Sequence, residues 1–249
     1  MLSDPPAALL VLAKTPVPGE VKTRLCPPAT PAQAARIAAA AFLDTLDAVL
    51  AVPQVIPVVA LTGDLGRAVD AAALSARLPA LTVLEQRGTT LGERIAAAYA
   101  DTAAVLGRRP VLQIGMDTPQ VDARLLSQCL ELLYAEGVDA ALGLATDGGW
   151  WVLGVRRPEL AELIVDVPTS RPDTGARTLA ALRTSGTRVR KLPELSDVDI
   201  WADAVAVAAQ VPEGRFAAAV AAVAAASSSD APSPDGKPSS PVRAIAWEL

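Results

Sequence analysis

Residues 9–28 read LLVLAKTPVPGEVKTRLCPP, a short apolar run that leads directly into a proline-rich loop carrying positive charge. The run Leu9–Ala13 is uninterrupted and short, which favours a buried strand. The chain has only four lysines, and two of them, Lys14 and Lys22, lie in the loop together with Arg24 and four prolines. A stiff cationic loop directly after the first strand, and ahead of a capped helix, predicts a ligand site at the edge of a sheet.

The alternation of strand-like and helix-like segments continues along the chain. Strands are predicted at Val55–Leu61, Leu81–Glu85, Pro110–Gly115 and Asp139–Leu144, and helices near Pro31–Leu50, Gly66–Arg77, Leu91–Leu106 and Asp122–Ala135. Two of these helices begin with capping boxes, Thr30–Gln33 and Thr90–Glu93. The pattern predicts an α/β, Rossmann-like protein with a mostly parallel sheet and helices on both faces.

The regularity weakens after Thr146. A strand at Trp150–Val155, a helix at Thr174–Thr184, a short strand at Thr187–Lys191 and helices at Ile200–Ala209 and Ala217–Ala226 are expected there. Residues 227–241 read SSSDAPSPDGKPSSP, a linker composition. We therefore predict one domain over residues 1–226 and a flexible tail over 227–249, in which Trp247 could dock back onto the domain.

Composition excludes several classes of protein. The chain has no histidine, which removes histidine nucleophile systems, histidine bases and histidine metal ligands. A net charge of −5 argues against nucleic-acid partners. No apolar run approaches the roughly 18 residues of a membrane span. Two cysteines, Cys26 and Cys129, and a start without the basic residues of a signal peptide predict a cytoplasmic protein with no reactive thiol.

Four unusual segments follow predicted strands: residues 14–28, RGTTLGER at 87–94, GMDTP at 115–119 and ATDGGWW at 145–151. Ligands bind outside the carboxyl ends of the strands in open parallel sheets, so these segments are expected to converge on one site. In the first loop, Gly19 permits close backbone approach, and Lys22, Thr23 and Arg24 suit a polyphosphate. The alternative is an ordinary proline-rich turn with solvated charges.

Carboxylates near the expected site suggest a metal. Asp117 ends a strand and could hold a hard cation such as Mg²⁺. The alternative for this segment is helix capping, with Thr118 or Asp122 as the cap of the next helix and Pro119 near its start. A second carboxylate, Asp199, lies in the DVD segment before a late helix, where the residues alone favour an N-cap. In ATDGGWW, the two tryptophans should point to opposite faces of a strand, so at most one of them is expected to line a site.

The 87–94 segment is similarly open to two readings. Its capping box accounts for Thr90 and Glu93, while Gly88 and Gly92 leave room for a flat base against the backbone.

Five segments together resemble a known family: LLVLAKTPVPGEVKTRLCP, TLGERIAAA, QIGMDTP, LGLATDGGWWVLGV and LPELSDVDIWAD. They look like the GT-A-fold bacterial transferases of the radical-SAM and selenodomain-associated type. That glycosyltransferase-like group is similar to 2-phospholactate guanylyltransferases and, more distantly, to molybdenum-cofactor guanylyltransferases. The resemblance runs from about Ala8 to Ala209 and implies a GT-A nucleotide-binding fold.

The resemblance also implies roles for individual residues. The loop Lys14–Leu25, with Gly19, Lys22, Thr23 and Arg24, would hold the phosphates of a nucleotide. Thr90, Leu91 and Gly92 would lie against its base. Asp117 and Asp199 would bind Mg²⁺ or Mn²⁺. Asp147, Gly148, Gly149 and Trp150 would face the acceptor.

The chain departs from the family pattern at three places: Met116 stands where Ser or Thr is usual, Trp150–Trp151 where tyrosines are usual, and Ile200 where Thr is common. None of these departures removes a proposed metal ligand.

The leading hypothesis is a Mg²⁺-dependent nucleotidyltransferase that joins a nucleoside monophosphate unit from a nucleoside triphosphate to a small phosphorylated acceptor and releases pyrophosphate. Lys22, Arg24 and Asp117 would be its catalytic residues. One alternative is a GT-A glycosyltransferase with a sugar nucleotide donor, but such enzymes usually place D-x-D at the strand end, where this chain has GMD. The other alternative is a nucleotide-binding protein without catalytic activity.

Overall fold

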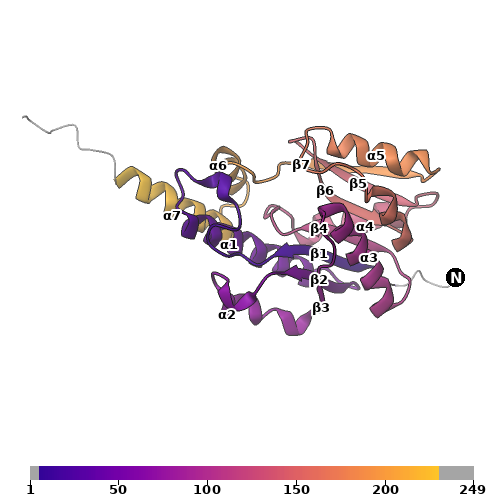
Figure 1. Ribbon diagram of the computed structural model, residues 1–249, viewed down its shortest axis with the longest axis horizontal. Helices are drawn as coiled ribbons and strands as arrows, with labels where there is room; N and C mark the ends of the chain where they lie inside the picture. The colour runs from indigo at the N-terminus through magenta and orange to yellow at the C-terminus, as the bar shows by residue number, and fades with distance from the viewer. Residues whose placement is uncertain (1–5, 230–249) are drawn as a thin grey trace, which may run out of the picture.

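Seven strands form one sheet in the order β3-β2-β1-β4-β6-β5-β7 in the computed structural model, which describes residues 6–229 (Figure 1). The strands are β1 (Ala8–Lys14), β2 (Ile56–Thr62), β3 (Thr82–Glu85), β4 (Val111–Gly115), β5 (Ala140–Ala145), β6 (Trp150–Val155) and β7 (Val189–Leu195). All neighbouring pairs are parallel except the two that involve β6. The predicted α/β fold with a mostly parallel sheet is confirmed.

Helices cover both faces of this sheet (Figure 1). They are α1 (Pro31–Leu50), α2 (Ala71–Ser75), α3 (Leu91–Leu106), α4 (Ala123–Tyr134), α5 (Thr174–Thr184), α6 (Trp201–Ala208) and α7 (Arg215–Ser229), with short 3₁₀ turns η1 (Thr23–Leu25), η2 (Leu65–Arg67), η3 (Leu78–Ala80) and η4 (Pro158–Ile164). Both predicted capping boxes are present, at Thr30 with Gln33 and at Thr90 with Glu93. These caps fix where α1 and α3 begin, because they satisfy backbone N–H groups that have no partner inside the helix.

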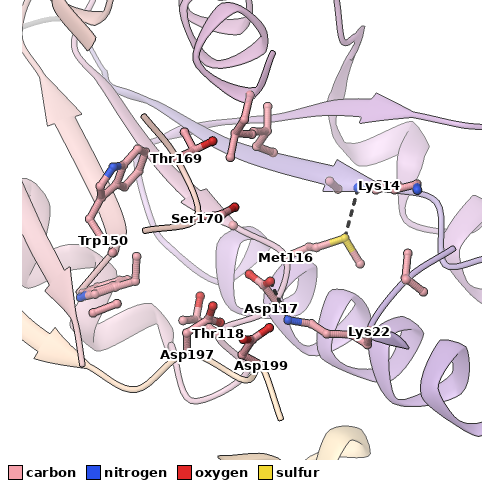
Figure 2. Close-up of a pocket in the computed structure, with 18 of the residues that line it drawn as sticks. Lys14, Lys22, Met116, Asp117, Thr118, Trp150, Thr169, Ser170, Asp197 and Asp199 are labelled. Carbon is pink, nitrogen blue, oxygen red and sulfur yellow. Dashed lines mark hydrogen bonds and ion pairs between the residues drawn. The ribbon is translucent and has the colours of Figure 1, made fainter. Parts of the chain in front are cut away.

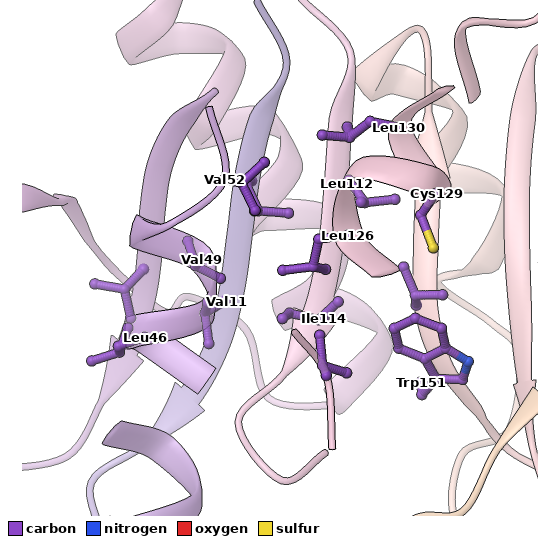
Figure 3. Close-up of a cluster of buried hydrophobic side chains, with 14 of the residues drawn as sticks. Val11, Leu46, Val49, Val52, Leu112, Ile114, Leu126, Cys129, Leu130 and Trp151 are labelled. Carbon is purple, nitrogen blue, oxygen red and sulfur yellow. The ribbon is translucent and has the colours of Figure 1, made fainter. Parts of the chain in front are cut away.

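The core consists of two apolar layers separated by the sheet. On one face, α1 and α4 pack on the sheet around Leu46, Leu112 and Leu126 (Figure 3). On the other face, α3, η4 and α5 pack around Ile95, Tyr99 and other buried side chains. The central strand β1 is buried on both faces, which explains its continuous apolar sequence.

The position of a ligand site follows from the order of the strands. From β1 the chain continues to β2 on one side, while β4, which comes later in the sequence, pairs with the other side of β1. The crevice between the carboxyl ends of β1 and β4 is therefore a topological switch point, where open α/β sheets bind ligands. The proline-rich loop after β1 and the GMDTP segment after β4 both begin there.

The C-terminal helices are attached to the first half of the chain. Phe216, Val220 and Val223 of α7 are buried against α1 and α6. The Asp44 carboxylate on α1 accepts hydrogen bonds from the Phe216 backbone N–H at 2.9 Å and from Arg215 at 2.8 Å. Helix α7 extends three residues past the predicted domain boundary at 226, to Ser229. The rest of the predicted tail, with Trp247, lies outside the described residues.

Two local predictions were wrong, and one element was not predicted. The expected helix at Gly66–Arg77 is reduced to the five residues of α2, because Asp70 adopts a left-handed backbone conformation with φ 56° that interrupts the helix. Strand β7 begins and ends later than expected, at Val189 and Leu195, and η4 was not expected at all.

No helix among residues 6–229 has the length and apolar character needed to cross a membrane.

Candidate functional site

A cavity of about 610 Å³ opens at the carboxyl ends of the central strands. Its wall combines segments that are distant in sequence: the loop after β1, the end of β4, the turn before β6, the loop before α5 and the DVD segment before α6. Figure 2 shows Lys14 and Lys22 on one side of this cavity and Trp150, Thr169 and Ser170 on the other. The four segments that the sequence singled out do meet in this one place.

Lys22 is the cation most firmly held in the cavity. Its Nζ lies 2.8 Å from Asp117 Oδ2 and also donates to the Val198 carbonyl, and its side chain is only 15% exposed. Burial of the ammonium lowers its pKa, but attraction by Asp117 and Asp197 outweighs that effect, so the pKa of Lys22 is above its ordinary value. Lys22 therefore stays charged at neutral pH.

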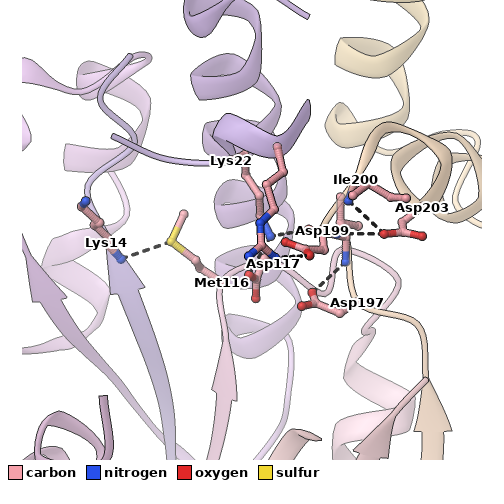
Figure 4. Close-up of polar contacts among 10 residues, drawn as sticks. Lys14, Lys22, Met116, Asp117, Asp197, Asp199, Ile200 and Asp203 are labelled. Carbon is pink, nitrogen blue, oxygen red and sulfur yellow. Dashed lines mark hydrogen bonds and ion pairs between the residues drawn. The ribbon is translucent and has the colours of Figure 1, made fainter. Parts of the chain in front are cut away.

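Three aspartates surround this lysine (Figure 4). Asp199 Oδ2 lies 2.6 Å from Arg24 Nη1, and this pair is more exposed, at 43% and 69% of the two side chains. Asp197 accepts from the backbone N–H of Val198 at 2.7 Å. Burial, followed by repulsion from Asp117, raises the pKa of Asp197 to about 7. This end of the cavity thus concentrates negative charge around a single buried ammonium.

Asp199 does not serve as a helix cap. The N-cap residue of α6 is Ile200, and the Asp203 carboxylate accepts from the backbone N–H groups of Asp199 and Ile200, at 3.2 and 2.9 Å. The Asp199 side chain is left to face Arg24. The N-cap interpretation that the residues alone favoured is wrong, whereas Asp122 does cap α4, as one interpretation of the GMDTP segment required.

The expected phosphate-binding cations and the expected metal ligands are paired with one another. Lys22 pairs with Asp117 and Arg24 pairs with Asp199. Among residues 6–229, no group of three or more His, Cys, Asp or Glu side chains is placed to cage a metal ion. One further oxygen is available next to Asp117, because the Thr118 hydroxyl is buried without a hydrogen-bond partner and Thr118 lines the cavity.

At the lysine side, the cavity wall includes Lys14, Lys22, Thr23 and Arg24, but not Gly19. Gly19 has a φ of +79° and open space around it, so its role is to turn the loop. Gln86 also lines this side. Its Nε2 donates to the carbonyls of Ala13 and Ala60 at 2.7 and 2.8 Å, which ties the end of β3 to its neighbour β2 and, beyond it, to β1.

Of the three residues expected at a nucleobase, only Leu91 lines the cavity. The Thr90 hydroxyl accepts from the Glu93 backbone N–H as part of the capping box. Gly92 is buried, and a Cβ there would lie 2.2 Å from the Val165 carbonyl oxygen. Close packing against η4 therefore explains this glycine.

On the opposite side, Asp147, Gly149 and Trp150 line the cavity as expected, and Gly148 does not. Gly148 has a φ of +90°, and a Cβ there would lie 1.9 Å from the Pro172 carbonyl oxygen. Trp150 packs toward one apolar layer and Trp151, which is 4% exposed, belongs to the other. The prediction that the two indoles point to opposite faces is confirmed, but the expectation that at most one of the tryptophans lines the site is wrong, because Trp150 and Trp151 both line the cavity.

Several lining residues were not predicted. Thr169, Ser170 and Arg171 come from the loop before α5, Thr174 is the first residue of α5, and Gln113 comes from the middle of β4. A polar residue inside the apolar run VLQIG was a usable signal for Gln113. No comparable signal marked the loop PTSRPDT, because its place beside the turn at Asp147–Gly149 depends on packing between distant segments.

Comparisons with known proteins add to this geometry. A family model described as "Uncharacterized protein conserved in bacteria (DUF2064)" matches residues 45–171. A comparison with curated proteins gives no match.

Among solved structures, the chain is similar to a Desulfovibrio desulfuricans protein provisionally assigned as a nucleotide-diphospho-sugar transferase. The TM-score is 0.75 at 26% identity, over 88% of this chain and 95% of that one. A cytidylyltransferase from Leptospira borgpetersenii gives a TM-score of 0.56 at 14% identity, over 90% and 96% of the two chains. A CMP:2-keto-3-deoxy-manno-octonic acid synthetase in complex with CTP gives 0.51 at 12% identity, over 79% and 94%. The fold is thus that of the nucleotide-diphospho-sugar transferases.

Proposed function

Because the chain belongs to the DUF2064 family and has the fold of nucleotide-diphospho-sugar transferases, we propose that it is a nucleotidyltransferase. It would transfer a nucleoside monophosphate unit from a nucleoside triphosphate to a small phosphorylated acceptor and release pyrophosphate. The observation that carries this proposal is the placement of Lys22: a buried, charged ammonium at the switch point of the sheet, facing carboxylates at the end of β4.

The cations would bind and stabilise the phosphates. Lys22 and Thr23 line the cavity from a loop held at both ends, by β1 and by the capped helix α1, and Arg24 reaches the wall from the same loop. Held cations of this kind stabilise the charge that develops on transferring and leaving phosphates more strongly than mobile ones. In the resting protein Asp117 and Asp199 are their partners, and a bound triphosphate would compete with these carboxylates.

The carboxylates fit a magnesium ion by their chemistry. Mg²⁺ prefers oxygen ligands and is commonly bound through one or two carboxylates together with substrate phosphates. Asp117 and Asp199 offer such oxygens, and the unpaired Thr118 hydroxyl lies beside Asp117 in sequence. We propose that Asp117 and Asp199 hold the ion. When bound, Mg²⁺ supplies neutralisation of phosphate charge at this end of the cavity.

The transfer itself needs no protein base. An oxygen of the acceptor phosphate attacks the α-phosphorus, a new P–O–P linkage forms, and the bond from the α-phosphorus to the oxygen bridging to the β-phosphate breaks. Pyrophosphate departs with that electron pair. The acceptor phosphate is already ionised near pH 7, so the absence of histidine from the chain is compatible with this reaction.

The two sides of the cavity suit the two substrates. The lysine side, with Leu91, Gln86 and Arg94, would take the nucleotide, and the side with Asp147, Gly149 and Trp150 would take the acceptor. A finer relationship, to the radical-SAM and selenodomain-associated transferases and to 2-phospholactate guanylyltransferases, rests on the sequence motifs and is part of the same proposal.

A glycosyltransferase with a sugar nucleotide donor is the second candidate. The relative from Desulfovibrio desulfuricans, which is 26% identical, favours it through its provisional assignment as a nucleotide-diphospho-sugar transferase. The single carboxylate at the end of β4 favours nucleotidyl transfer instead.

The test is incubation of the purified protein with each nucleoside triphosphate, Mg²⁺ and a set of phosphorylated acceptors, with pyrophosphate release as the readout. A parallel set uses sugar nucleotides with release of nucleoside diphosphate as the readout. The proposal predicts pyrophosphate release that Asp117→Asn reduces by about 10²-fold or more, while Asp166→Asn, a change outside the cavity, has no effect. Turnover of a sugar nucleotide with no triphosphate turned over would reject the proposal in favour of the second candidate.

A further inference from the structure

The side of the cavity opposite the lysines is lined by hydroxyl and amide groups and an indole ring, together with two charged residues, Arg171 and Asp147. The neutral groups are Thr169 and Ser170 in the loop before α5, Gln113 in β4, and Trp150 at the start of β6. We propose that this side selects an acceptor with several hydroxyl groups, a sugar phosphate or polyol phosphate, and binds those hydroxyls through Thr169, Ser170 and Gln113. The inference rests on the proposed function for the ligand's role as acceptor and adds its chemical class.

The hydroxyls of Thr169 and Ser170 are available to a ligand. Both residues line the cavity, and within residues 6–229 neither hydroxyl has a hydrogen-bond partner. Figure 2 shows both side chains on the same side of the cavity as Trp150. Each hydroxyl can donate one hydrogen bond and accept others, which matches the hydroxyls of a polyol.

The loop that carries these hydroxyls is held rigidly. The Thr174 hydroxyl accepts from the Arg171 backbone N–H at 3.2 Å and donates to the Pro168 carbonyl at 2.9 Å. The Gly175 N–H donates to the Gly148 carbonyl at 2.8 Å, so the start of α5, where the loop ends, is bonded to the turn before β6. A ligand therefore meets hydroxyls that are already placed, and little conformational entropy is lost when it binds.

Gln113 provides an independent observation. It is 3% exposed and lies between Leu10 and Leu153 in the sheet register, yet it lines the cavity. Its Oε1 has no partner in the described chain, and its Nε2 makes only a long contact of 3.5 Å to the Ile114 carbonyl. Because an unpaired buried amide is costly, a ligand hydroxyl that donates to Oε1 would remove a penalty already present in the protein.

Trp150 and Asp147 complete this side. The Trp150 indole is partly buried against the apolar layer and presents its remaining surface to the cavity, where the C–H face of a sugar can pack. Asp147 Oδ1 accepts from the Gly149 N–H at 2.8 Å, and its second oxygen has no partner in residues 6–229. That oxygen can accept a hydrogen bond from a ligand hydroxyl.

This set of groups discriminates against small phosphorylated acids without hydroxyls. Such an acid could pair with Arg171 but would leave the buried Gln113 amide without a partner, and sites built to bind a hydroxyl reject analogues that lack it. Hydroxyl recognition thus predicts a preference for polyol phosphates over phosphoenolpyruvate.

The preference is tested by calorimetric titration of the full chain, saturated with Mg²⁺ and a non-hydrolysable nucleoside triphosphate. The ligands are several hexose 1-phosphates, glycerol 3-phosphate and phosphoenolpyruvate. We expect at least one hydroxylated phosphate to bind about tenfold or more tightly than phosphoenolpyruvate, as one or two good hydrogen bonds allow. The double variant Thr169→Val, Ser170→Ala should lose about tenfold for that ligand and leave phosphoenolpyruvate unchanged.

Thr184→Val, whose hydroxyl bonds to the Ala180 carbonyl outside the cavity, is the matched control. The single changes and Gln113→Leu serve if the double variant does not fold. Equal or tighter binding of phosphoenolpyruvate overturns the inference, as does an unchanged preference in the variants. Since binding is measured without turnover, selective polyol binding with no pyrophosphate from any triphosphate would reject the nucleotidyltransferase proposal and leave the acceptor class standing.

Discussion

The Lys22 ammonium lies 2.8 Å from Asp117 Oδ2 and joins the loop after β1 to the end of β4, across the switch point of the sheet. This ion pair sets the charge arrangement of the site in the resting protein. The side chains of Lys22 and Asp117 are 15% and 36% exposed, so both are partly desolvated. Each ion therefore needs a counterion. A nucleotide bound with its metal could supply both at once, because its phosphates would pair with Lys22 and the metal would pair with Asp117.

Replacing Lys22 with methionine tests the cation's role. The aliphatic stem is roughly kept, but the charge is lost from the site proposed for the phosphates. We expect kcat/KM for the triphosphate to fall by about 10²–10³-fold, the usual effect of removing a donor that stabilises transferring charge. We also expect the free energy of unfolding to fall by about 1–2 kcal/mol, because Asp117 and Asp197 lose their shared counterion. Steady-state kinetics and urea unfolding measure the two effects.

Lys191→Met is the control for this change, since Lys191 is exposed on β7 and lies outside the cavity wall. Arg24→Ala gives a useful contrast. The Arg24–Asp199 pair is largely exposed, so its loss should alter stability by less than about 0.5 kcal/mol while still weakening triphosphate binding. Unchanged nucleotide kinetics in both Lys22→Met and Arg24→Ala would contradict the assignment of this loop to phosphates.

The pKa of Asp197 predicts a pH effect on stability. That pKa is raised from 3.8 to about 7 in the folded protein, first by burial and then by repulsion from Asp117, against the attraction of Lys22. Between pH 4 and 7 the folded state therefore binds more protons than the unfolded state, and stability falls as pH rises through this window. The Asp197→Asn variant lacks this contribution. The melting temperature of the variant should therefore rise relative to that of the wild type as pH increases from 4.5 to 8. Parallel melting curves at all pH values would contradict a raised pKa.

The order of strands and helices was largely predictable from the sequence, and the predictions that failed did so for physical reasons. Capping boxes at Thr30 and Thr90 are local patterns, so the starts of α1 and α3 were predicted correctly. Whether β6 runs parallel or antiparallel depends on which strands it pairs with, and no local pattern records this. The left-handed conformation of Asp70 was likewise not predictable from local sequence, because the pattern of residues around it is that of a continuous helix.

The candidate site was predictable where a residue type is rare in its context. Lysines in the proline loop and the carboxylate after β4 stood out, and both line the cavity. The loop with Thr169 and Ser170 did not stand out, because its composition resembles any surface turn. Its position is fixed by close backbone contact between Gly148 and Pro172, which only the folded chain reveals.

Gly148→Ala tests that backbone contact. A Cβ at Gly148 would lie 1.9 Å from the Pro172 carbonyl oxygen, and the φ of +90° adds strain. We expect a loss of about 2–4 kcal/mol in the free energy of unfolding, from overpacking and strain together. Gly186→Ala is the matched control, with a φ of +81° and open space around it, and should lose only about 1 kcal/mol. Equal losses in the two variants, measured by urea unfolding, would show that the contact has no energetic weight.

The resting ion pairs also predict that nucleotide and metal stabilise the protein together. Mg²⁺ alone must compete with Lys22 for Asp117, and a triphosphate alone must compete with Asp117 for Lys22. When both are present, each supplies the counterion that the other displaces, so binding should be cooperative. We expect either ligand alone at millimolar concentration to shift the melting temperature little. Both together should stabilise by about 2–3 kcal/mol once the complex is near saturation, as ligand linkage gives at about 100 times Kd. Thermal denaturation with Mg²⁺, a non-hydrolysable triphosphate, or both measures this directly.

In Asp117→Asn the synergy should disappear, because Lys22 is then free to bind phosphate without a metal. Synergy that survives in Asp117→Asn would place the metal elsewhere in the cavity.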